Sequence, residues 1–159
     1  MNKNKVICII PARGGSKGIK LKNLKKICGK PLIYYPIKAA LSSKACDKII
    51  VSTDSKKIAI AAKKFGAEVP FLREKKFSKD YTTTEETLKE ALIQAESFYK
   101  CRFEICVFLA STNLFRQSAW IKEAVSELKK NKSVDSAFSV HKFYKHIWHN
   151  KGNKLKKVL

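Results

Sequence analysis

Short apolar runs alternate along the chain with stretches in which apolar residues recur every three or four positions. The run at residues 5–10 is rich in β-branched residues and is closed by Pro11, which is typical of a strand buried on both faces. Comparable runs predict further strands over residues 47–55, 67–72, 103–111 and 134–140. Helical spacing of apolar residues predicts helices over residues 30–43, 56–66, 85–99 and 118–131.

Prolines and short polar residues mark where these helices should begin. Pro31 is expected at the first position of the first helix, and Pro36 should kink or shorten its first turns. Asp54 or Ser55 can cap the second helix. The three threonines at 82–84 supply cap candidates for the third helix, which has two glutamates in its first turn.

Strands that alternate with helices across short connections predict one α/β domain over residues 1–159. Its expected architecture is a Rossmann-like, mostly parallel sheet with helices on both faces. Residues 141–159 are expected to form two short strands around a turn at 150–153. In parallel sheets ligands bind beyond the carboxyl ends of the strands. We therefore expect the functional residues in the loops that follow the strands, at residues 12–23, 53–55, 72–84 and 110–117.

The charge balance is strongly basic, because 34 Lys and Arg face 13 Asp and Glu and give a formal net charge of +21. Such a charge can indicate a nucleic-acid partner. Nearly all the excess, however, is lysine scattered in pairs along the chain, which is typical of a solvated surface. We therefore expect no specific nucleic-acid partner. The four arginines, which bind phosphate and carboxylate better, are Arg13, Arg73, Arg102 and Arg116.

Cysteine usage and hydropathy indicate a cytoplasmic protein. The five cysteines are an odd number without a C-x-x-C pair, which favours free thiols in a reducing compartment. The apolar run near the N-terminus is too short for a signal peptide. No apolar stretch approaches the roughly 20 residues of a membrane span, so no membrane partner is expected.

The loop after the first strand carries the main candidate chemistry. The sequence IIPARGGSKGIKLKNL at residues 9–24 fits neither G-x-G-x-x-G nor the P-loop template. Its glycines nevertheless allow backbone N–H groups to approach an anion, and Arg13, Lys17 and Lys22 add positive charge. The alternative is a flexible basic surface loop, but the strand before it and the helix after it favour a polyphosphate site.

This loop, followed by GKPLI at residues 29–33, resembles the N-terminal signature of the acylneuraminate cytidylyltransferases, also called CMP-sialic acid synthetases. The chain is similar to that family again at residues 51–74, at Asp80 with the threonines that follow it, and at residues 146–159. The resemblance therefore extends from Lys5 to the last residue.

The resemblance implies a fold of the nucleotide-diphospho-sugar transferase type and a Mg²⁺-dependent reaction. In that reaction the anomeric hydroxyl of a nonulosonic acid, such as N-acetylneuraminate, legionaminate or pseudaminate, attacks the α-phosphorus of CTP. The products are the CMP-sugar and pyrophosphate. The resemblance also implies a homodimer when the protein is full length.

Site residues are carried over from the family only where the motifs match. The resemblance implies catalytic roles for Arg13, Lys17 and Lys22. It implies substrate binding by Asn113 and Arg116. The residues expected at the nucleotide are Ala12, Arg13, Gly14, Gly15, Ser16, Lys17, Lys22, Asn23, Arg73, Thr83 and Thr112.

Two features depart from the family pattern. Where the family usually reads Q-P-T-S-P-L-R, residues 110–116 read ASTNLFR, so the Gln and both Pro positions are changed at Ala110, Ser111 and Leu114. In addition, the family continues past the region that Leu159 ends, to an Asp-x-Asp pair that binds the metal. The chain is thus expected to be a C-terminally truncated member without metal ligands of its own. Asp54 is interpreted as a helix cap or pocket-orienting residue.

The sequence is also compatible with several other functions. The nearest is a sister cytidylyltransferase for 3-deoxy-manno-octulosonate, although the Gly-Gly-Ser-Lys-Gly form of the first loop speaks against it. A non-catalytic CTP-binding remnant and a basic nucleic-acid binder are further alternatives. His141, His146 and His149 fall in a predicted hairpin without nearby Cys or carboxylate, so they are not expected to bind a metal.

Overall fold

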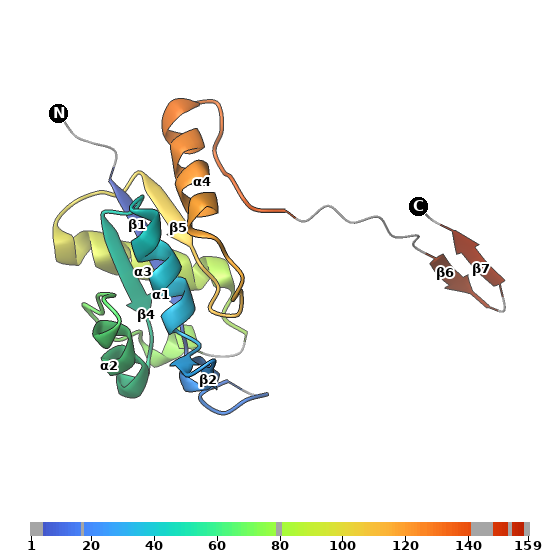
Figure 1. The fold of residues 1–159 in the computed structure, drawn as a ribbon, viewed down its shortest axis with the longest axis horizontal. Coiled ribbons are helices and arrows are strands. Elements are labelled where there is room, and N and C mark those ends of the chain that lie inside the picture. The colour runs from blue at the N-terminus through green and yellow to red at the C-terminus, as the bar shows by residue number, and fades with distance from the viewer. Residues whose placement is uncertain (1–4, 17, 79–80, 141–147, 153, 158–159) are drawn as a thin grey trace.

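The computed structural model describes residues 5–16, 18–78, 81–140, 148–152 and 154–157. Its centre is a three-stranded parallel sheet with the strand order β4-β1-β5 (Figure 1). The strands are β1 (Val6–Pro11), β4 (Lys48–Ser52) and β5 (Ile105–Phe108). Because all three strands are parallel, their carboxyl ends meet at one edge of the sheet.

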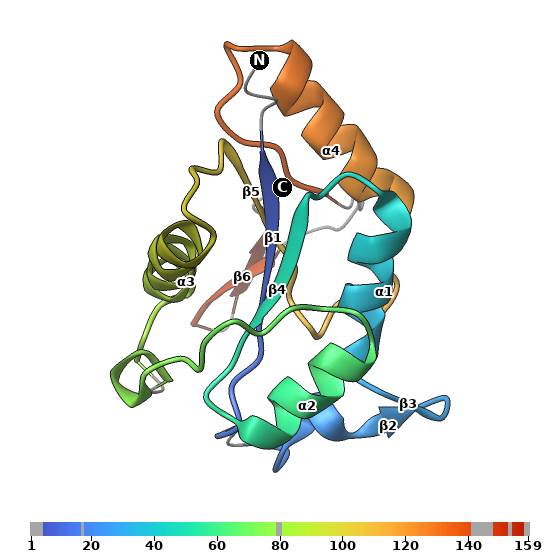
Figure 2. The same ribbon diagram turned by 90° about the vertical axis from the view of Figure 1, so that its left-hand side faces the viewer.

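Alternate residues of β1 point to opposite faces of the sheet. Cys8 and Ile10 pack in a cluster with side chains of α1 (Tyr34–Ser43), α2 (Lys56–Lys64) and α4 (Ser118–Lys130). Ile7 and Ile9 pack on the other face with Ala91 and Ala95 of α3 (Thr84–Tyr99). Figure 2 shows α3 on one side of the strands and α1 with α4 on the other. The expected α/β fold with helices on both faces is confirmed.

Two of the predicted strands are wrong. In residues 67–72 only one parallel bridge forms, between Ile50 and Glu68. Pro70 lacks an N–H group, which limits further pairing. Residues 134–140 form no strand, and residues 135–140 are exposed. Alternating composition predicts a strand, but no neighbour among the described residues supplies the hydrogen-bond partners that a strand requires.

The prediction that Pro31 begins the first helix is also wrong. Pro31 pairs with Lys26 in a small antiparallel ladder of β2 (Lys26–Ile27) and β3 (Lys30–Pro31), and α1 begins at Tyr34. Pro36 is therefore the third residue of α1. Its missing N–H is one that an α-helix leaves without an internal partner, so the proline is accommodated in the first turn.

Both predicted helix caps form. Ser55 caps α2, since its Oγ accepts a hydrogen bond of 3.5 Å from the N–H of Ile58. Thr83 caps α3 in a reciprocal capping box with Glu86. Two 3₁₀ turns complete the body and lie in the loops after β1 and before α3; they are η1 (Lys22–Leu24) and η2 (Lys75–Ser78).

The predicted C-terminal hairpin is present as β6 (Trp148–Lys151) and β7 (Lys154–Lys157), paired in antiparallel register. It lies apart from the layered body in Figure 1. His141 and His146 fall outside the described residues. No described helix is both long and apolar enough to cross a membrane. In the described part of the chain, no three or more His, Cys, Asp or Glu side chains gather as a metal site.

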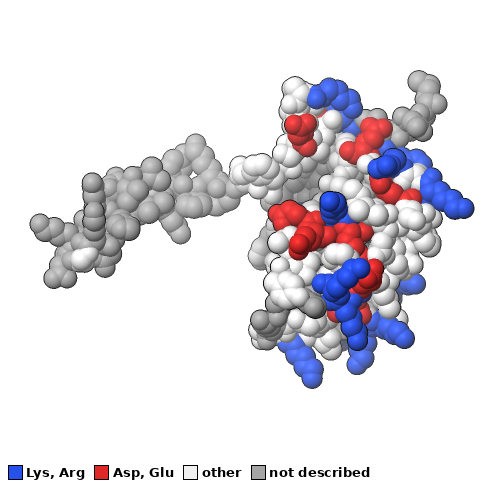
Figure 3. All heavy atoms as spheres, turned by 180° about the vertical axis from the view of Figure 1, so that it is seen from behind, with Lys and Arg blue, Asp and Glu red and all other residues white. Residues whose placement is uncertain are grey.

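Charged side chains are mixed on the face that α3 covers. In Figure 3, acidic side chains gather near the middle of this face, with lysines and arginines around them. This arrangement differs from a continuous basic stripe. All five cysteines are free, and only Cys8 is fully buried.

Candidate functional site

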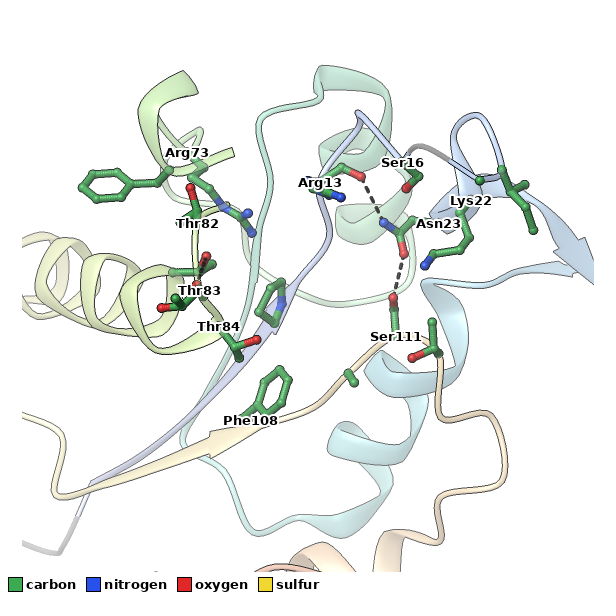
Figure 4. A pocket seen from close by; sticks show the side chains of 17 residues that line it. Arg13, Ser16, Lys22, Asn23, Arg73, Thr82, Thr83, Thr84, Phe108 and Ser111 are labelled. Atoms are coloured by element: carbon green, nitrogen blue, oxygen red, sulfur yellow. Dashed lines mark hydrogen bonds between the residues drawn. The ribbon is translucent and has the colours of Figure 1, made fainter. Parts of the chain in front are cut away.

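A pocket of about 620 Å³ lies at the carboxyl ends of β1 and β5 (Figure 4). One side, here called the loop wall, comes from the loop after β1 and consists of Arg13, Ser16, Gly18, Ile19, Lys22 and Asn23. The opposite side, the helix wall, consists of Arg73, Phe77 and four threonines at the start of α3, namely Thr82, Thr83, Thr84 and Thr87. Phe108 and residues 110–112 close the pocket between the two walls. The pocket thus lies where a parallel sheet is expected to bind its ligand.

The loop wall places Arg13, Ser16, Lys22 and Asn23 around the pocket (Figure 4). Asn23 is only 3% exposed. Its Nδ2 donates to the carbonyl oxygen of Arg13 at 3.1 Å, and its Oδ1 accepts from Ser111 Oγ at 2.7 Å. The basic residues of this wall are therefore carried by a loop that is bonded to the end of β5.

Gly14 packs so closely against Ser55 that a side chain at position 14 would require Ser55 to shift. A Cβ atom there would lie 3.0 Å from the Cβ of Ser55. The N–H of Gly14 donates to Asp54 Oδ1 at 2.8 Å. Asp54 thus holds the first loop, while its neighbour Ser55 caps α2. Of the two cap candidates for α2, Ser55 is therefore the cap, and the carboxylate of Asp54 is bonded to the first loop instead.

The helix wall is built around the buried side chain of Arg73, which is 5% exposed. Its Nε donates to Ser52 Oγ at 2.9 Å, and its Nη2 donates to the carbonyl oxygen of Ser52. Burial lowers the pKa of Arg73, while the negative charges of Asp54 and Glu90 act in the opposite direction. Arg13 also lowers the pKa of Arg73, which shows that the two cations of the opposing walls interact.

Hydroxyl groups and aromatic rings form the rest of the helix wall and the pocket floor. Thr83 uses its hydroxyl to cap α3, and Thr87 Oγ1 donates to the carbonyl oxygen of Thr83 at 3.0 Å. Phe108 is 44% exposed although it ends a strand of the central sheet. The pocket therefore combines a cationic side, suited to phosphate groups, with polar and aromatic surface suited to a ring.

The structure brings most of the predicted site residues to this pocket. The predicted residues that line it are Arg13, Ser16, Lys22, Asn23, Arg73, Thr83 and Thr112. Ala12, Gly14 and Gly15 belong to the same loop but do not line the pocket, and Ala12 is buried. Lys17 lies outside the described residues.

Asn113 and Arg116 lie away from this pocket, at neighbouring hollows beside α4. The guanidinium group of Arg116 is 3.4 Å from the carbonyl oxygen of Ala110. Burial lowers the pKa of Arg116, and Cys8 acts in the opposite direction. The substrate-binding roles implied for Asn113 and Arg116 stay predictions.

Several lining residues were not singled out from the sequence, among them Phe77, Thr82, Thr84, Thr87, Phe108 and Ser111. Phe108 ends β5 and Ser111 lies in the loop that follows it, which is a usable signal for a ligand-facing position. Thr87 follows Thr83 by four residues on α3, so helical spacing places both on one side. Phe77 has no comparable signal.

The described wall of the pocket contains no Asp or Glu. Mg²⁺ prefers oxygen ligands such as carboxylates and often reaches a site with the phosphates of a nucleotide. Asp54, which follows β4 and does not line the pocket, accepts a hydrogen bond from the N–H of Gly14. The described residues therefore do not form a magnesium site by themselves.

Fold and site together define an α/β protein with a pocket lined by basic side chains at the carboxyl edge of a parallel sheet. A structure of CMP:2-keto-3-deoxy-manno-octonic acid synthetase complexed with CTP has the same fold. Its TM-score is 0.68 at 22% identity, covering 82% of this chain and 49% of that chain. At that identity the likeness shows the fold alone.

A family model described as cytidylyltransferase matches residues 7–159, and the chain belongs to this family. It is 38% identical over 129 residues to the pseudaminic acid cytidylyltransferase of Campylobacter jejuni, covering 81% of this chain and 55% of the relative. It is 39% identical over 121 residues to the CMP-N,N'-diacetyllegionaminic acid synthase of Legionella pneumophila, covering 76% and 52%. The chain spans about half the length of these curated relatives.

Proposed function

We propose that this chain carries the nucleotide-binding part of an enzyme that transfers CMP from CTP to a nonulosonic acid and releases pyrophosphate. The observation that carries the proposal is the pocket in which Arg13, Lys22 and Arg73 approach one cavity from two walls. Because no acidic side chain lines its described part, the cavity suits the negative charge of a triphosphate. Membership of the cytidylyltransferase family supports CTP as the nucleotide.

In the proposed reaction the anomeric hydroxyl of the sugar acid attacks the α-phosphorus of CTP. The hydroxyl gives up its proton to water as a new P–O bond forms to the sugar. The bond from the α-phosphorus to the oxygen that bridges it to the β-phosphorus breaks, and pyrophosphate leaves with that oxygen. Negative charge develops on the leaving oxygens, so fixed cations lower the barrier. We assign this electrostatic role to Arg13 and Lys22, and by the family resemblance to Lys17.

The sugar substrate is proposed from the relatives, whose names include pseudaminic and N,N'-diacetyllegionaminic acids. The candidate acids are thus pseudaminate, legionaminate and N-acetylneuraminate. Mg²⁺ dependence and a homodimer of the full-length protein belong to the same proposal. The free cysteines support a reducing cytoplasm as the place of reaction.

The test is pyrophosphate release from CTP and Mg²⁺ with each candidate acid, measured on this chain and on any longer protein that contains it. Release with at least one acid is expected, together with loss of release in Arg13→Ala. Saturable binding of CTP without release for any acid would leave only a CTP-binding remnant and would contradict the transfer reaction.

The sister reaction with 3-deoxy-manno-octulosonate is the second candidate, because the CTP-complexed synthetase for the related sugar acid shares the fold. The higher identity to the pseudaminic and legionaminic relatives favours the nine-carbon acids. A comparison of kcat/KM for the eight-carbon and nine-carbon acids separates the two, and we expect the nine-carbon acid to give the larger value.

A further inference from the structure

The buried amide of Asn23 connects the loop after β1 with the loop after β5. The carbonyl oxygen of Arg13 can only accept a hydrogen bond, so the Nδ2 of Asn23 must face it, at 3.1 Å. The Oδ1 of Asn23 then faces Ser111, whose hydroxyl donates at 2.7 Å. Ser111 is itself 7% exposed. This bond therefore lies in a buried environment, where the loss of one partner is costly.

The loop after β4 holds the same segment from the other side. The N–H of Gly14 donates to Asp54 Oδ1 at 2.8 Å, and the N–H of Ala12 donates to the carbonyl oxygen of Ser52 at 2.9 Å. The peptide group between Arg13 and Gly14 is thus fixed at both ends. Its carbonyl oxygen is held by Asn23 and its N–H by Asp54.

This peptide group sets the direction in which Arg13 leaves the main chain. Arg13 lines the pocket, and further along the same loop Ser16, Gly18 and Lys22 line it as well. A rigid loop loses less conformational freedom when it binds an anion than a loop that must first be ordered. Hydrogen bonds that fix the Arg13–Gly14 peptide therefore favour anion binding, even though the residues that make them do not contact the anion.

We propose that Ser111, Asn23 and Asp54 are positioning residues that fix the Arg13–Gly14 peptide for binding of the CTP triphosphate. In this inference, which rests on the proposed function, Asn23 acts through the peptide rather than as a direct phosphate ligand. Two observations support that role. The Nδ2 and the Oδ1 of Asn23 are both hydrogen-bonded within the protein, and the residue is buried.

The role of Asp54 is that of a hydrogen-bond acceptor, not that of a charge. A carboxylate beside a triphosphate site repels the ligand, and Asp54 also interacts electrostatically with Arg73. Its contribution to binding must therefore come from the bond to Gly14. An amide oxygen at this position can accept the same bond without the negative charge.

The first test measures the Kd for CTP with serine variants. Ser111→Ala removes the donor to Asn23 and should weaken binding about tenfold. Ser111→Thr keeps the hydroxyl and should restore most of the affinity. Ser133→Ala is the matched control, because Ser133 Oγ makes the same 2.7 Å bond to an asparagine Oδ1 on the exposed surface. Equal affinity of Ser111→Ala and wild type would overturn the role of Ser111.

The second test compares two variants of Asp54. Asp54→Ala removes the acceptor and should weaken CTP binding about tenfold, whereas Asp54→Asn should bind as well as wild type or better. If both variants bind equally weakly, the charge matters and the positioning role is wrong. If neither variant differs from wild type, the bond to Gly14 is irrelevant to binding.

The third test does not depend on CTP. The chain has six glycines, so a protein labelled with ¹⁵N-glycine gives a small set of amide signals, among them Gly14. Hydrogen exchange at Gly14 should become faster in Asp54→Ala and stay unchanged in Ser133→Ala. Unchanged exchange in Asp54→Ala would overturn the proposed bond. If hydrogen exchange at Gly14 responds as expected but the wild-type protein does not bind CTP, the proposed function is wrong. The conclusion that the Arg13–Gly14 peptide is fixed by hydrogen bonds would still hold.

Discussion

The two walls of the pocket carry similar chemical groups but are held in different ways. The loop wall is fixed by bonds between loops that follow three different strands, and these bonds involve main-chain groups of residues 12–14. The helix wall is fixed by the side chains that form it, since Arg73 binds Ser52 and Thr83 caps α3. From this contrast we predict that substitutions in the loop wall will mainly change CTP affinity, while substitutions in the helix wall will also change stability.

The largest effect is expected on the loop wall. Arg13→Ala removes a cation from the triphosphate site and should weaken CTP binding about 100-fold, or about 2.7 kcal/mol, with little change in the unfolding free energy. Titration calorimetry and urea denaturation measure the two quantities. Arg102→Ala is the control, because Arg102 is exposed and pairs with Glu96 away from the pocket. A large loss of stability in Arg13→Ala would break the distinction between the walls.

For Arg73, the buried arginine of the helix wall, the main effect is expected on the unfolding free energy. Arg73→Met removes the donor to Ser52 Oγ and the positive charge near Asp54 and Glu90. The unfolding free energy should fall by about 2 kcal/mol. Urea denaturation monitored by circular dichroism measures the change. An unchanged midpoint would show that the bonds of Arg73 do not support the helix wall.

A smaller loss of stability is expected at the start of α3. Thr83→Ala removes the side-chain acceptor of the capping box and should cost about 1 kcal/mol. Thr83→Ser keeps the acceptor and serves as the matched control. CTP binding should change little in either variant, because the Thr83 hydroxyl is already engaged in the cap. A loss of affinity larger than the loss of stability would instead indicate a direct contact with the nucleotide.

The smallest effect concerns Glu90, which lies in α3 behind the helix wall and is 8% exposed. Burial raises the pKa of its carboxyl, and Oε2 finds no hydrogen-bond partner among the residues that the structure describes. The native state therefore holds this proton more tightly than the unfolded chain, so ionisation of Glu90 lowers stability as the pH rises through the native pKa.

Glu90→Gln should accordingly raise the denaturation midpoint at pH 8 and leave it unchanged below about pH 4, where both states are protonated. Urea denaturation at the two pH values measures the difference. Glu123→Gln on the exposed side of α4 is the control. A stabilisation that is the same at both pH values would contradict the assignment to Glu90 ionisation.

The sequence predicts β1 and the loop wall better than it predicts residues 134–140 or the start of α1, because β1 and its loop depend on local residues. A buried β-branched run followed by glycines and cations defines β1 and its loop from local residues alone. The pairing of residues 134–140 and the start of α1 depend on partners elsewhere in the fold, and both predictions were wrong. Local propensity cannot show whether a neighbouring strand is present.

The roles of individual site residues were harder to predict than their position. Asn23 is predicted to hold the nucleotide and lines the pocket, and the structure adds that its amide is bonded to Arg13 and Ser111. These bonds join residues that are 10 and 88 positions apart in the sequence. No local pattern reveals such a contact, and only the fold brings the ends of β1 and β5 together.

The most direct test of the proposed nucleotide site is a crystal structure of the chain with CTP. The triphosphate should lie in the pocket between the two walls, in contact with Arg13 and Lys22, while Asn23 keeps its bonds to Arg13 and Ser111. A triphosphate bound elsewhere on the chain, or a complex in which neither Arg13 nor Lys22 approaches a phosphate oxygen, would contradict the assignment.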